Sequence, residues 1–452
     1  MQTRLRRNSN LLPFLTAAML LMELFDGSRI WALLLVGLGG AWLVSYLWAR
    51  SLQRNLRFTR EMRFGWAQVG DTLEERLTLD NRGWAPALWV EIKDRSTLPG
   101  YRASEVTGVG SGSRNQWRTR GLCTRRGLYT IGPTQLETGD PLGVYTLLCD
   151  DPSSTHLMVM PPVVTLPSIE VAPGGLSGDG RPRQNAPERT VSAASVRAYA
   201  PGDSLHTIHW PTTARHDAPY VHIFDGTPAG DWWIILDLDQ RAQVGQDWDS
   251  TEEHAIILAA SLADRGLRQR RAVGLAANAE KLVWLPPQEG DHHRWEILRA
   301  LALVKPGPVP LAALLERTRP LIGRQCSVIV ITPNLSGAWL EYLLPLLWRG
   351  IVPTILLLDA ATFAAPGVGS ADVDPRLAGA PKEDKRPTGE AQALAETLAQ
   401  LGLARYIITH DMLNQPEMRP GQRGKWEWRA TPTGRAVPVH QPGDTAWKML
   451  SG

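Results

Sequence analysis

The sequence predicts a multidomain protein with an N-terminal transmembrane helical hairpin, a β-sandwich-like module and a doubly wound α/β domain. Three observations predict this class. Two apolar runs lie near the N-terminus, short alternating segments fill residues 58–170, and buried-strand runs then alternate with helical segments. A chain of 452 residues is long enough for roughly three units of ~150 residues, each with a buried core.

The hairpin is predicted within residues 1–57. Apolar runs cover residues 11–25 and 30–49, and only the letters DGSR separate them. At about 1.5 Å per residue, the second run is long enough to cross about 30 Å of hydrocarbon. The first run is short and carries Glu23 near its end, so it would be marginal alone. A cleaved signal peptide is the alternative, but no small-x-small cleavage site follows the run.

Arginines give the expected orientation of this hairpin. They precede and follow the pair of helices, whereas the turn between the helices carries Arg29 beside Asp26. Because Lys and Arg are enriched in cytoplasmic loops, we expect a multi-pass protein of the cell membrane with both termini and the soluble domains in the cytoplasm. A single anchor of the opposite orientation is the alternative. The flanking arginines are Arg4, Arg6, Arg7, Arg50, Arg54, Arg57, Arg60 and Arg63.

Residues 58–170 have the pattern of antiparallel strands. Leu73, Leu77 and Leu79 fall on one face of one segment, and Val90 and Ile92 fall on one face of the next. Gly, Asn, Asp and Pro stand at the breaks between segments. This period-two alternation predicts a β-rich, sandwich-like module.

A Gly/Pro-rich linker at residues 171–190 separates that module from the α/β domain, residues 191–414. Apolar strand runs such as DWWIILDLDQ and CSVIVITPN alternate there with helical segments, one of them capped by Thr251. That order predicts a mostly parallel sheet with helices on both faces. An insertion at about 361–390 is expected to be mobile, and the tail, 415–452, to hold at most one hairpin.

Composition and motifs argue against several classes of protein and of functional site. The net charge of +3 is small and spread along the chain, so it gives no support to nucleic acid as a partner. The three cysteines are far apart and form no CxxC pair, so neither a zinc knuckle nor a disulfide framework is expected. The chain has no Gly-rich phosphate loop, no H-E-x-x-H and no G-x-S-x-G. No catalytic residue is therefore assigned.

One segment, VRAYAPGDSLHTIHWPTTARHDAPYV at 196–221, is unusually rich in Arg, Asp, His and Trp. The Pro-Gly-Asp sequence at 201–203 predicts a tight turn. That turn would bring Arg197 or Arg215 to Asp203, with Trp210 supplying apolar area beneath the pair. The segment is then either an internal buttress or a clasp whose exposed rim binds a partner.

The alternative for this segment is a metal-dependent hydrolase that uses residues 203–222. His206 and His209 are spaced to chelate a metal, but no Cys or Glu completes a recognised set of ligands. The chain also has no recognisable nucleophile–base motif, which favours a binding protein.

A second candidate site follows the first α/β strand, where Asp237 and Asp239 stand. Carboxylates at the carboxyl end of such a strand lie where open α/β sheets bind ligands. The domain resembles von Willebrand A-type domains, which hold Mg²⁺ on a D-x-S-x-S motif. Here Asp239 and Arg241 stand in place of the two serines, so the site looks degraded, and Asp237→Ala is expected to cost little stability.

The pattern R-x-Y-x-P-G-D-S-x-x-x-I-H-W-x-x-x-A-R resembles the signature of the domain of unknown function 58 family. An upstream RRG-x-Y…DP-x-G segment is similar to another part of that family. The departure is His206, where many members carry Arg. The residues that carry the resemblance are Arg197, Tyr199, Pro201, Gly202, Asp203, Ile208, His209, Trp210 and Arg215, with Arg126, Gly127, Tyr129, Asp140, Pro141 and Gly143 upstream.

This resemblance implies a prokaryotic, membrane-anchored protein that works with a MoxR-type AAA ATPase and other membrane proteins. It implies a non-enzymatic adaptor role in protein complex assembly or in cell-envelope processes. No cofactor is expected, and Mg²⁺ at Asp237 and Asp239 is the alternative.

Overall fold

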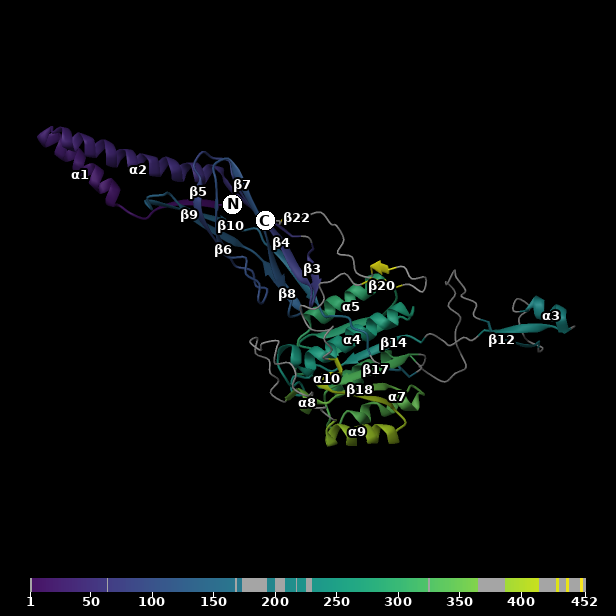
Figure 1. Ribbon diagram of the computed structural model, residues 1–452. Helices are drawn as coiled ribbons and strands as arrows, with labels where there is room; N and C mark the ends of the chain where they lie inside the picture. The colour runs from purple at the N-terminus through teal and green to yellow at the C-terminus, as the bar shows by residue number, and fades with distance from the viewer. Residues whose placement is uncertain are drawn as a thin grey trace, which may run out of the picture. The chain divides into compact units, whose positions relative to one another are not determined.

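The computed structural model contains two compact units. One unit comprises Met1–Val164, Leu298–Val304 and Asp411–Gly452, and the other comprises Thr165–Ile297 and Lys305–His410 (Figure 1). The structure describes residues 2–62, 64–166, 169–172, 193–199, 208–216, 218–224, 230–323, 326–364, 387–413, 428–430, 436–438 and 448–449.

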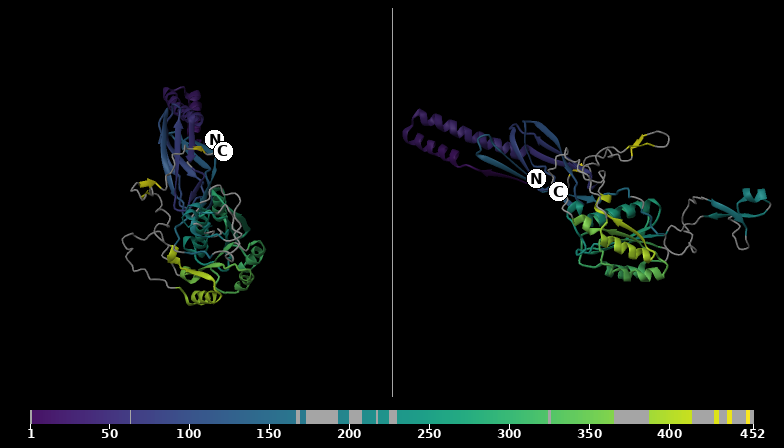
Figure 2. Two further views of the ribbon diagram at one scale, coloured as in Figure 1. Left: turned by 90° about the vertical axis from the view of Figure 1, so that its right-hand side faces the viewer. Right: turned by 60° about the horizontal axis from the view of Figure 1, so that its bottom comes forward.

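Two helices lie side by side near the N-terminus of the first unit, α1 (Leu11–Asp26) and α2 (Arg29–Asn55) (Figures 1 and 2). Gly27 ends α1 at a φ of +49°, which glycine adopts without strain, and the Ser28 side chain caps α2 by accepting from the Ile30 backbone N–H. Within the described residues, α2 alone is long and apolar enough to cross a membrane.

The remainder of the first unit is β-rich, as the period-two pattern predicts. The five-stranded sheet is antiparallel and has the order β1-β10-β9-β5-β6, and the other two sheets have the orders β22-β2-β4-β7 and β3-β11-β8. The predicted leucines of β4 are buried, as are Val90 and Ile92 of β5. The strands are β1 (Gln2–Arg7), β2 (Leu56–Met62), β3 (Trp66–Gln68), β4 (Thr72–Asn81), β5 (Ala87–Asp94), β6 (Glu105–Val109), β7 (Ser113–Leu122), β8 (Gly127–Ile131), β9 (Thr134–Gly139), β10 (Tyr145–Asp151), β11 (Thr155–Met160) and β22 (Lys448–Met449).

Two of these strands come from segments for which the sequence predicts no strand. Strand β1 precedes the helices and pairs along its length with β10, and β22 of the tail pairs with Glu61 and Met62 of β2. The tail also holds the hairpin of β20 (Trp428–Ala430) and β21 (Ala436–Pro438). Both ends of the helix pair are therefore joined to strands of the same module.

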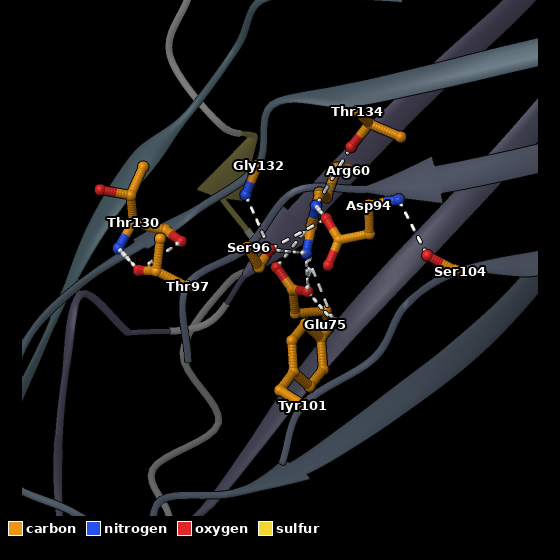
Figure 3. Close-up of polar contacts among 10 residues, drawn as sticks. All are labelled: Arg60, Glu75, Asp94, Ser96, Thr97, Tyr101, Ser104, Thr130, Gly132 and Thr134. Carbon is orange, nitrogen blue, oxygen red and sulfur yellow. Dashed lines mark hydrogen bonds and ion pairs between the residues drawn. The ribbon is translucent and has the colours of Figure 1, made fainter. Parts of the chain in front are cut away.

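A buried ion cluster links the sheets that contain β2 and β5 (Figure 3). The Arg60 guanidinium of β2 donates to both carboxylate oxygens of Glu75, at 2.6 to 3.1 Å, and to Asp94 at 2.6 Å. It also donates to the hydroxyls of Ser96 and Thr134, at 3.1 Å each. All the partners of this charge are thus supplied from inside the protein.

The interactions of this cluster outweigh the cost of its burial. Burial alone would lower the pKa of Arg60, but the hydrogen bonds and negative charge of Glu75 raise it above its ordinary value. The Tyr101 hydroxyl donates to Glu75, and burial together with that carboxylate raises the pKa of Tyr101. Arg60 therefore belongs to the core and cannot serve as one of the membrane-flanking charges that the orientation argument counted.

The second unit contains a six-stranded sheet of order β16-β15-β14-β17-β18-β19. Every neighbouring pair is parallel except β15 and β16, which form an antiparallel hairpin at one edge of the sheet. A separate pair, β12 and β13, makes a two-stranded sheet. The strands are β12 (Ala193–Ala198), β13 (Tyr220–Phe224), β14 (Trp232–Leu236), β15 (Val273–Asn278), β16 (Leu282–Gln288), β17 (Ser327–Thr332), β18 (Thr354–Leu358) and β19 (Ala404–Ile408).

Helices cover both faces of the six-stranded sheet. Helices α6, α7 and α9 share one apolar cluster with Trp233 and Ile235, while α4 packs against β14, β15 and β17 outside that cluster. The cap of α4 is Ser250 and not the expected Thr251, since the Ser250 hydroxyl accepts from the Glu253 backbone N–H. The helices are α3 (Trp210–His216), α4 (Thr251–Arg268), α5 (Asp291–Leu303), α6 (Leu311–Thr318), α7 (Leu344–Trp348), α8 (Ala360–Ala364), α9 (Gly389–Gln400) and α10 (His410–Leu413).

Several predicted boundaries fall outside the described residues. These include most of the linker at 171–190, and residues 365–386 of the insertion expected at 361–390. The two ends of that insertion are described, because α8 begins it and α9 starts at Gly389.

The Arg60 cluster generates the first prediction. Arg60→Ala leaves the carboxylates of Glu75 and Asp94 buried without their cation, which is expected to cost about 3–5 kcal/mol. Arg120→Ala on β7 is the control, because Arg120 is largely exposed and its pair with Glu74 is worth at most about 1 kcal/mol. Hydrogen exchange of β2 and β4 peptides in the full-length chain measures both losses. Equal protection in the two variants would contradict the structural role of Arg60.

Candidate functional site

The carboxyl ends of the parallel strands in the second unit carry polar side chains. Asp237 follows β14, Asn278 ends β15, and Thr332 ends β17. Asp359 follows β18, and His410 stands two residues beyond β19. Because parallel strands bring these ends to one edge, and open α/β sheets bind ligands there, this edge is the candidate site.

Asp237 is the centre of one half of this edge. Its side chain is fully buried and accepts hydrogen bonds from Asn278 Nδ2 at 2.9 Å, from Thr332 Oγ1 at 2.7 Å and from the Asp239 backbone N–H at 3.1 Å. Burial raises the pKa of Asp237, and the donors from Thr332 and Asn278 act in the opposite direction. The carboxylate thereby joins the ends of β14, β15 and β17.

Asp239 is held by a different partner. Arg241 donates to both of its carboxylate oxygens, at 3.0 Å and 2.8 Å, in a bidentate pair, and the Arg241 backbone N–H adds a third bond of 3.1 Å. The predicted guanidinium is therefore in contact with the carboxylate that a cation would need. In the part of the chain that the structure describes, no group of three or more His, Cys, Asp or Glu residues is arranged to hold a metal ion.

The loop that follows β17 completes this half of the edge without adding a carboxylate. The Asn334 backbone N–H donates to Thr332 Oγ1 at 3.0 Å, and Asn334 Oδ1 accepts from the Ser336 backbone N–H at 2.9 Å. Thr332 thus donates to Asp237 while it accepts from its own loop. Asn334 therefore supplies an amide, which is used within the loop, and no carboxylate.

Two histidines occupy the other half of the edge. His254 of α4 is buried and stacks on His410, with ring centroids 5.4 Å apart and an interplanar angle of 16°. Phe363 lies edge-on to His254 at 4.8 Å, and His410 Nε2 lies 2.8 Å from Asp249 Oδ1. Among the described residues, neither ring nitrogen of His254 makes a hydrogen bond.

Burial controls the protonation of His254. Burial first, and the neighbouring His410 second, lower the pKa of His254 to about 3, while the charge of Asp249 acts in the opposite direction. A neutral imidazole is therefore built into the fold at neutral pH. After β18, Asp359 accepts from the backbone N–H and the hydroxyl of Thr388, at 2.7 Å and 2.9 Å, and so holds the N-cap residue of α9.

The signature segment is described in part. Strands β12 and β13 pair through backbone bonds that include Arg197 opposite Val221, and the Tyr199 N–H donates to the Pro219 carbonyl at 2.8 Å. His209 Nδ1 lies 2.7 Å from Thr212 Oγ1 at the start of α3. Trp210 is 68% exposed, and Arg215 of the same helix is also exposed.

The remaining signature residues lie outside the described residues. These are Pro201, Gly202 and Asp203, along with His206 and Asp217 of the hydrolase hypothesis. The ion pair of Asp203 with Arg197 or Arg215 thus stays a prediction. What the structure does bring together is the backbone frame that carries Tyr199, His209 and Trp210.

The upstream residues of the resemblance form turns of the β-rich unit. Tyr129 donates its hydroxyl to the carbonyls of Arg125 and Arg126, at 3.1 Å each. Asp140 accepts from the Leu142 and Tyr145 backbone N–H groups, at 2.9 Å and 2.6 Å. The Arg126 guanidinium donates to the carbonyls of Leu301 and Val304, at 3.1 Å and 3.0 Å, so it joins segments that are far apart in the sequence.

Comparison with known families gives one match. The model of the family described as protein of unknown function DUF58 matches residues 195–381. This range holds the signature segment, both strand-edge aspartates and the Thr332 loop. It covers less than half of the chain, and neither the helix pair nor the upstream turns lie within it.

Similar proteins are found in species of Bacillus and Mycobacterium. The chain is 25% identical over 343 residues to the uncharacterized protein YeaD of Bacillus subtilis, which covers 72% of this chain and 82% of that protein. It is 25% identical over 179 residues to the uncharacterized protein Rv1480 of Mycobacterium tuberculosis, which covers 38% of this chain and 56% of that protein. Among solved structures, a CARDB domain from Pyrococcus furiosus matches 23% of this chain and 94% of its own, at 10% identity and a TM-score of 0.17, a level that carries no argument.

Asp237 generates the second prediction, and its burial revises the small effect that the sequence led us to expect. Asp237→Ala leaves buried donors on Asn278 and Thr332 without an acceptor, so a loss of about 2–4 kcal/mol is expected. Arg241→Ala, on the same turn but largely exposed, should cost less than about 1 kcal/mol. Hydrogen exchange of β14 and β17 peptides distinguishes the two. Protection in Asp237→Ala equal to wild type would refute the linking role.

Hydrogen exchange of the same peptides tests whether a cation binds at this edge. Asp237 has its acceptors filled and Asp239 is paired with Arg241, so Mg²⁺ should leave the exchange of wild-type β14 unchanged. Slower exchange with Mg²⁺ that disappears in Asp237→Ala would instead establish a cation site there.

His254 generates the third prediction. Since its folded pKa is below the unfolded value of about 6.5, the unfolded chain binds the extra proton, and stability falls as pH drops from about 6.5 towards 3. The free energy of unfolding then falls by up to about 1.4 kcal/mol per pH unit. His254→Leu should lessen this loss between pH 7 and 5, measured by exchange of α4 peptides, whereas His292→Leu, on the exposed side of α5, should not. Identical pH profiles for wild type and His254→Leu would exclude this assignment.

Proposed function

We propose that the protein is a membrane-anchored binding protein, an adaptor that works with a MoxR-type AAA ATPase in protein complex assembly or cell-envelope processes. The observation that carries this proposal is Trp210, a large apolar side chain exposed on α3 between β12 and β13. Exposed tryptophans are among the commonest energetic anchors of protein interfaces.

The small sheet that bears Trp210 also favours a binding role. Two-stranded sheets are marginally stable alone in water and gain stability from a surface that covers one face. β12 and β13 form such a pair, distinct from the six-stranded sheet. Arg215, exposed on the same helix, offers a planar donor beside the tryptophan. An aromatic residue and an arginine together are typical of an interface centre.

We infer further that the α/β part of the second unit is a von Willebrand A-like domain. The strand order, with β14 in the middle and β16 as an antiparallel edge, supports this inference. At the sheet edge, Asp237 and Asp239 are committed to bonds within the fold. That arrangement is consistent with a domain that binds its partner through its protein surface and not through a bridging cation.

The anchor of the proposed adaptor is α2, with α1 as the second helix of a hairpin. The apolar side chains of both helices are exposed to a degree that water does not favour. Arg4, Arg6 and Arg7 on one flank and Arg50, Arg54 and Arg57 on the other support a cytoplasmic location of the soluble parts, where an AAA ATPase would meet them.

Trp210 generates the fourth prediction. Truncating an interface tryptophan costs about 2 kcal/mol or more, so Trp210→Ala should raise the Kd for the MoxR-type ATPase of the same organism at least roughly 30-fold. Trp348→Ala is the matched control, because Trp348 is 81% exposed on α7 of the same unit. Binding is measured with the detergent-solubilised full-length chain, and hydrogen exchange verifies the fold.

Three outcomes separate the hypotheses. Weakened binding in Trp210→Ala alone supports the adaptor face. Equal binding by wild type and Trp210→Ala contradicts it. A metal-dependent hydrolytic activity that His209→Ala abolishes would favour the hydrolase that uses residues 203–222.

A further inference from the structure

Four large apolar side chains are exposed at one end of the β-rich unit. They are Trp84, Leu88, Trp89 and Leu142, between 37% and 59% exposed, and we call them the collar. They come from the loop between β4 and β5, from the first residues of β5, and from the turn between β9 and β10. Exposed apolar residues that are grouped in this way mark a contact surface.

Contacts with Trp48 place the Trp84 loop of the collar beside α2. The ring of Trp84 packs edge-on against that of Trp48 of α2, with centroids 5.7 Å apart. Leu142 belongs to the turn just before Tyr145, and Tyr145 pairs with Arg7, the last residue of β1, with three residues between it and the start of α1. The collar is therefore continuous with the exposed apolar surface of the helix pair.

The loop that carries Trp84 is fixed in place. Asn81, which is buried, donates to the carbonyls of Ala85 and Gly110, at 2.9 Å and 3.0 Å, and accepts from the Gly83 N–H at 3.0 Å. A Cβ at Gly83 would come within 2.6 Å of the Ser51 hydroxyl of α2, so the loop packs closely on that helix. Trp84 is thus presented outward by a rigid loop.

The turn that carries Leu142 is fixed as well. Asp140 accepts from the backbone N–H groups of Leu142 and Tyr145. Gly143 has a φ of +68°, the left-handed region that glycine adopts without strain. The turn thus holds Leu142 where its side chain is exposed.

Aromatic residues of α2 mark the same level. Trp42 Nε1 donates to the Tyr145 hydroxyl at 2.8 Å, and Trp48 Nε1 donates to the Pro86 carbonyl at 3.0 Å. Leu33, nearer the N-terminal end of α2, is largely exposed, while Leu52 beyond this level is fully buried. Tryptophan and tyrosine concentrate at the boundary between hydrocarbon and water, so the boundary falls between Trp42 and Trp48.

We propose that the collar inserts into the interfacial layer of the bilayer that α2 crosses, so that the β-rich unit rests directly on the membrane. The proposal depends on the membrane anchoring proposed above, and adds a second contact to it. The charges beside the collar fit a lipid surface, since Arg6 and Arg7 are exposed at the end of β1 and Arg82 is exposed next to Trp84. Arginines around an apolar edge match anionic headgroups better than they match an identical basic copy of the chain.

Single labelled cysteines in the full-length chain test the proposal. Leu88→Cys and Leu142→Cys report on the collar, and Leu33→Cys reports on the membrane span. Leu128→Cys is the matched control, because Leu128 is also exposed, at 49%. It follows the C-terminal end of β7, whose ten residues extend about 30 Å away from the collar. The natural thiols are buried, and burial raises the pKa of Cys123 and of Cys149 to about 12 and raises that of Cys326, so a maleimide dye reacts with the introduced thiol.

The labelled chains are reconstituted into phosphatidylcholine–phosphatidylglycerol vesicles that contain nitroxide lipids. A headgroup nitroxide should quench dyes at residues 88 and 142 several-fold more than a dye at residue 128, and an acyl-chain nitroxide should quench the dye at residue 33. If residues 88 and 142 are quenched no more than residue 128 while residue 33 is quenched, the membrane contact of the collar is refuted and the membrane anchor is retained.

Two other outcomes are informative. If the dye at residue 33 is not quenched, both the membrane anchor and the membrane contact of the collar are refuted. Emission at 88 and 142 that shifts to the blue only as the protein-to-lipid ratio rises, without quenching, assigns the surface to a second copy of the chain and refutes the lipid contact.

Discussion

A charge inside a protein has to be surrounded by hydrogen-bond partners, and this constraint organises both compact units. In the β-rich unit, the guanidinium of Arg60 meets carboxylates and hydroxyls from strands of two sheets, so those sheets can pack only where all of these groups meet. In the α/β unit, the carboxylate of Asp237 has the same role at the ends of β14, β15 and β17. Each charge specifies one arrangement of strands, since any shift leaves it buried and unpaired.

The sequence predicts the regular parts of this fold well and the polar core poorly. Alternation placed Leu77 and Val90 on buried faces, and the strand–helix rhythm predicted the mostly parallel sheet. Arg60 was counted among the membrane-flanking charges, because a pattern of apolar residues carries no information about which charges pair. β1 and β22 were missed since each is short and is stabilised as a strand only by a distant partner.

At the sheet edge, the prediction of a degraded site followed from Arg241, and the structure pairs this residue with Asp239. The contribution of His254 and His410 could not be predicted. These residues are far apart in the sequence, and only the fold brings their rings together. One signal was available, namely that each parallel strand run ends in a polar residue. Applied to every strand, it would have found Asn278, Thr332 and Asp359 as well as Asp237.

The way in which the helix pair joins the β-rich unit has a mechanical consequence. β1 leads into α1 and is held by six residue pairs with β10, while α2 continues without a break into β2. A force that draws the helices away along the strand axis loads the bonds of β1 together, in shear, and not one after another. The helix pair is thus attached to strands of the β-rich unit at both of its ends, so a force on the helices is carried into the sheets with little stretching of the connection.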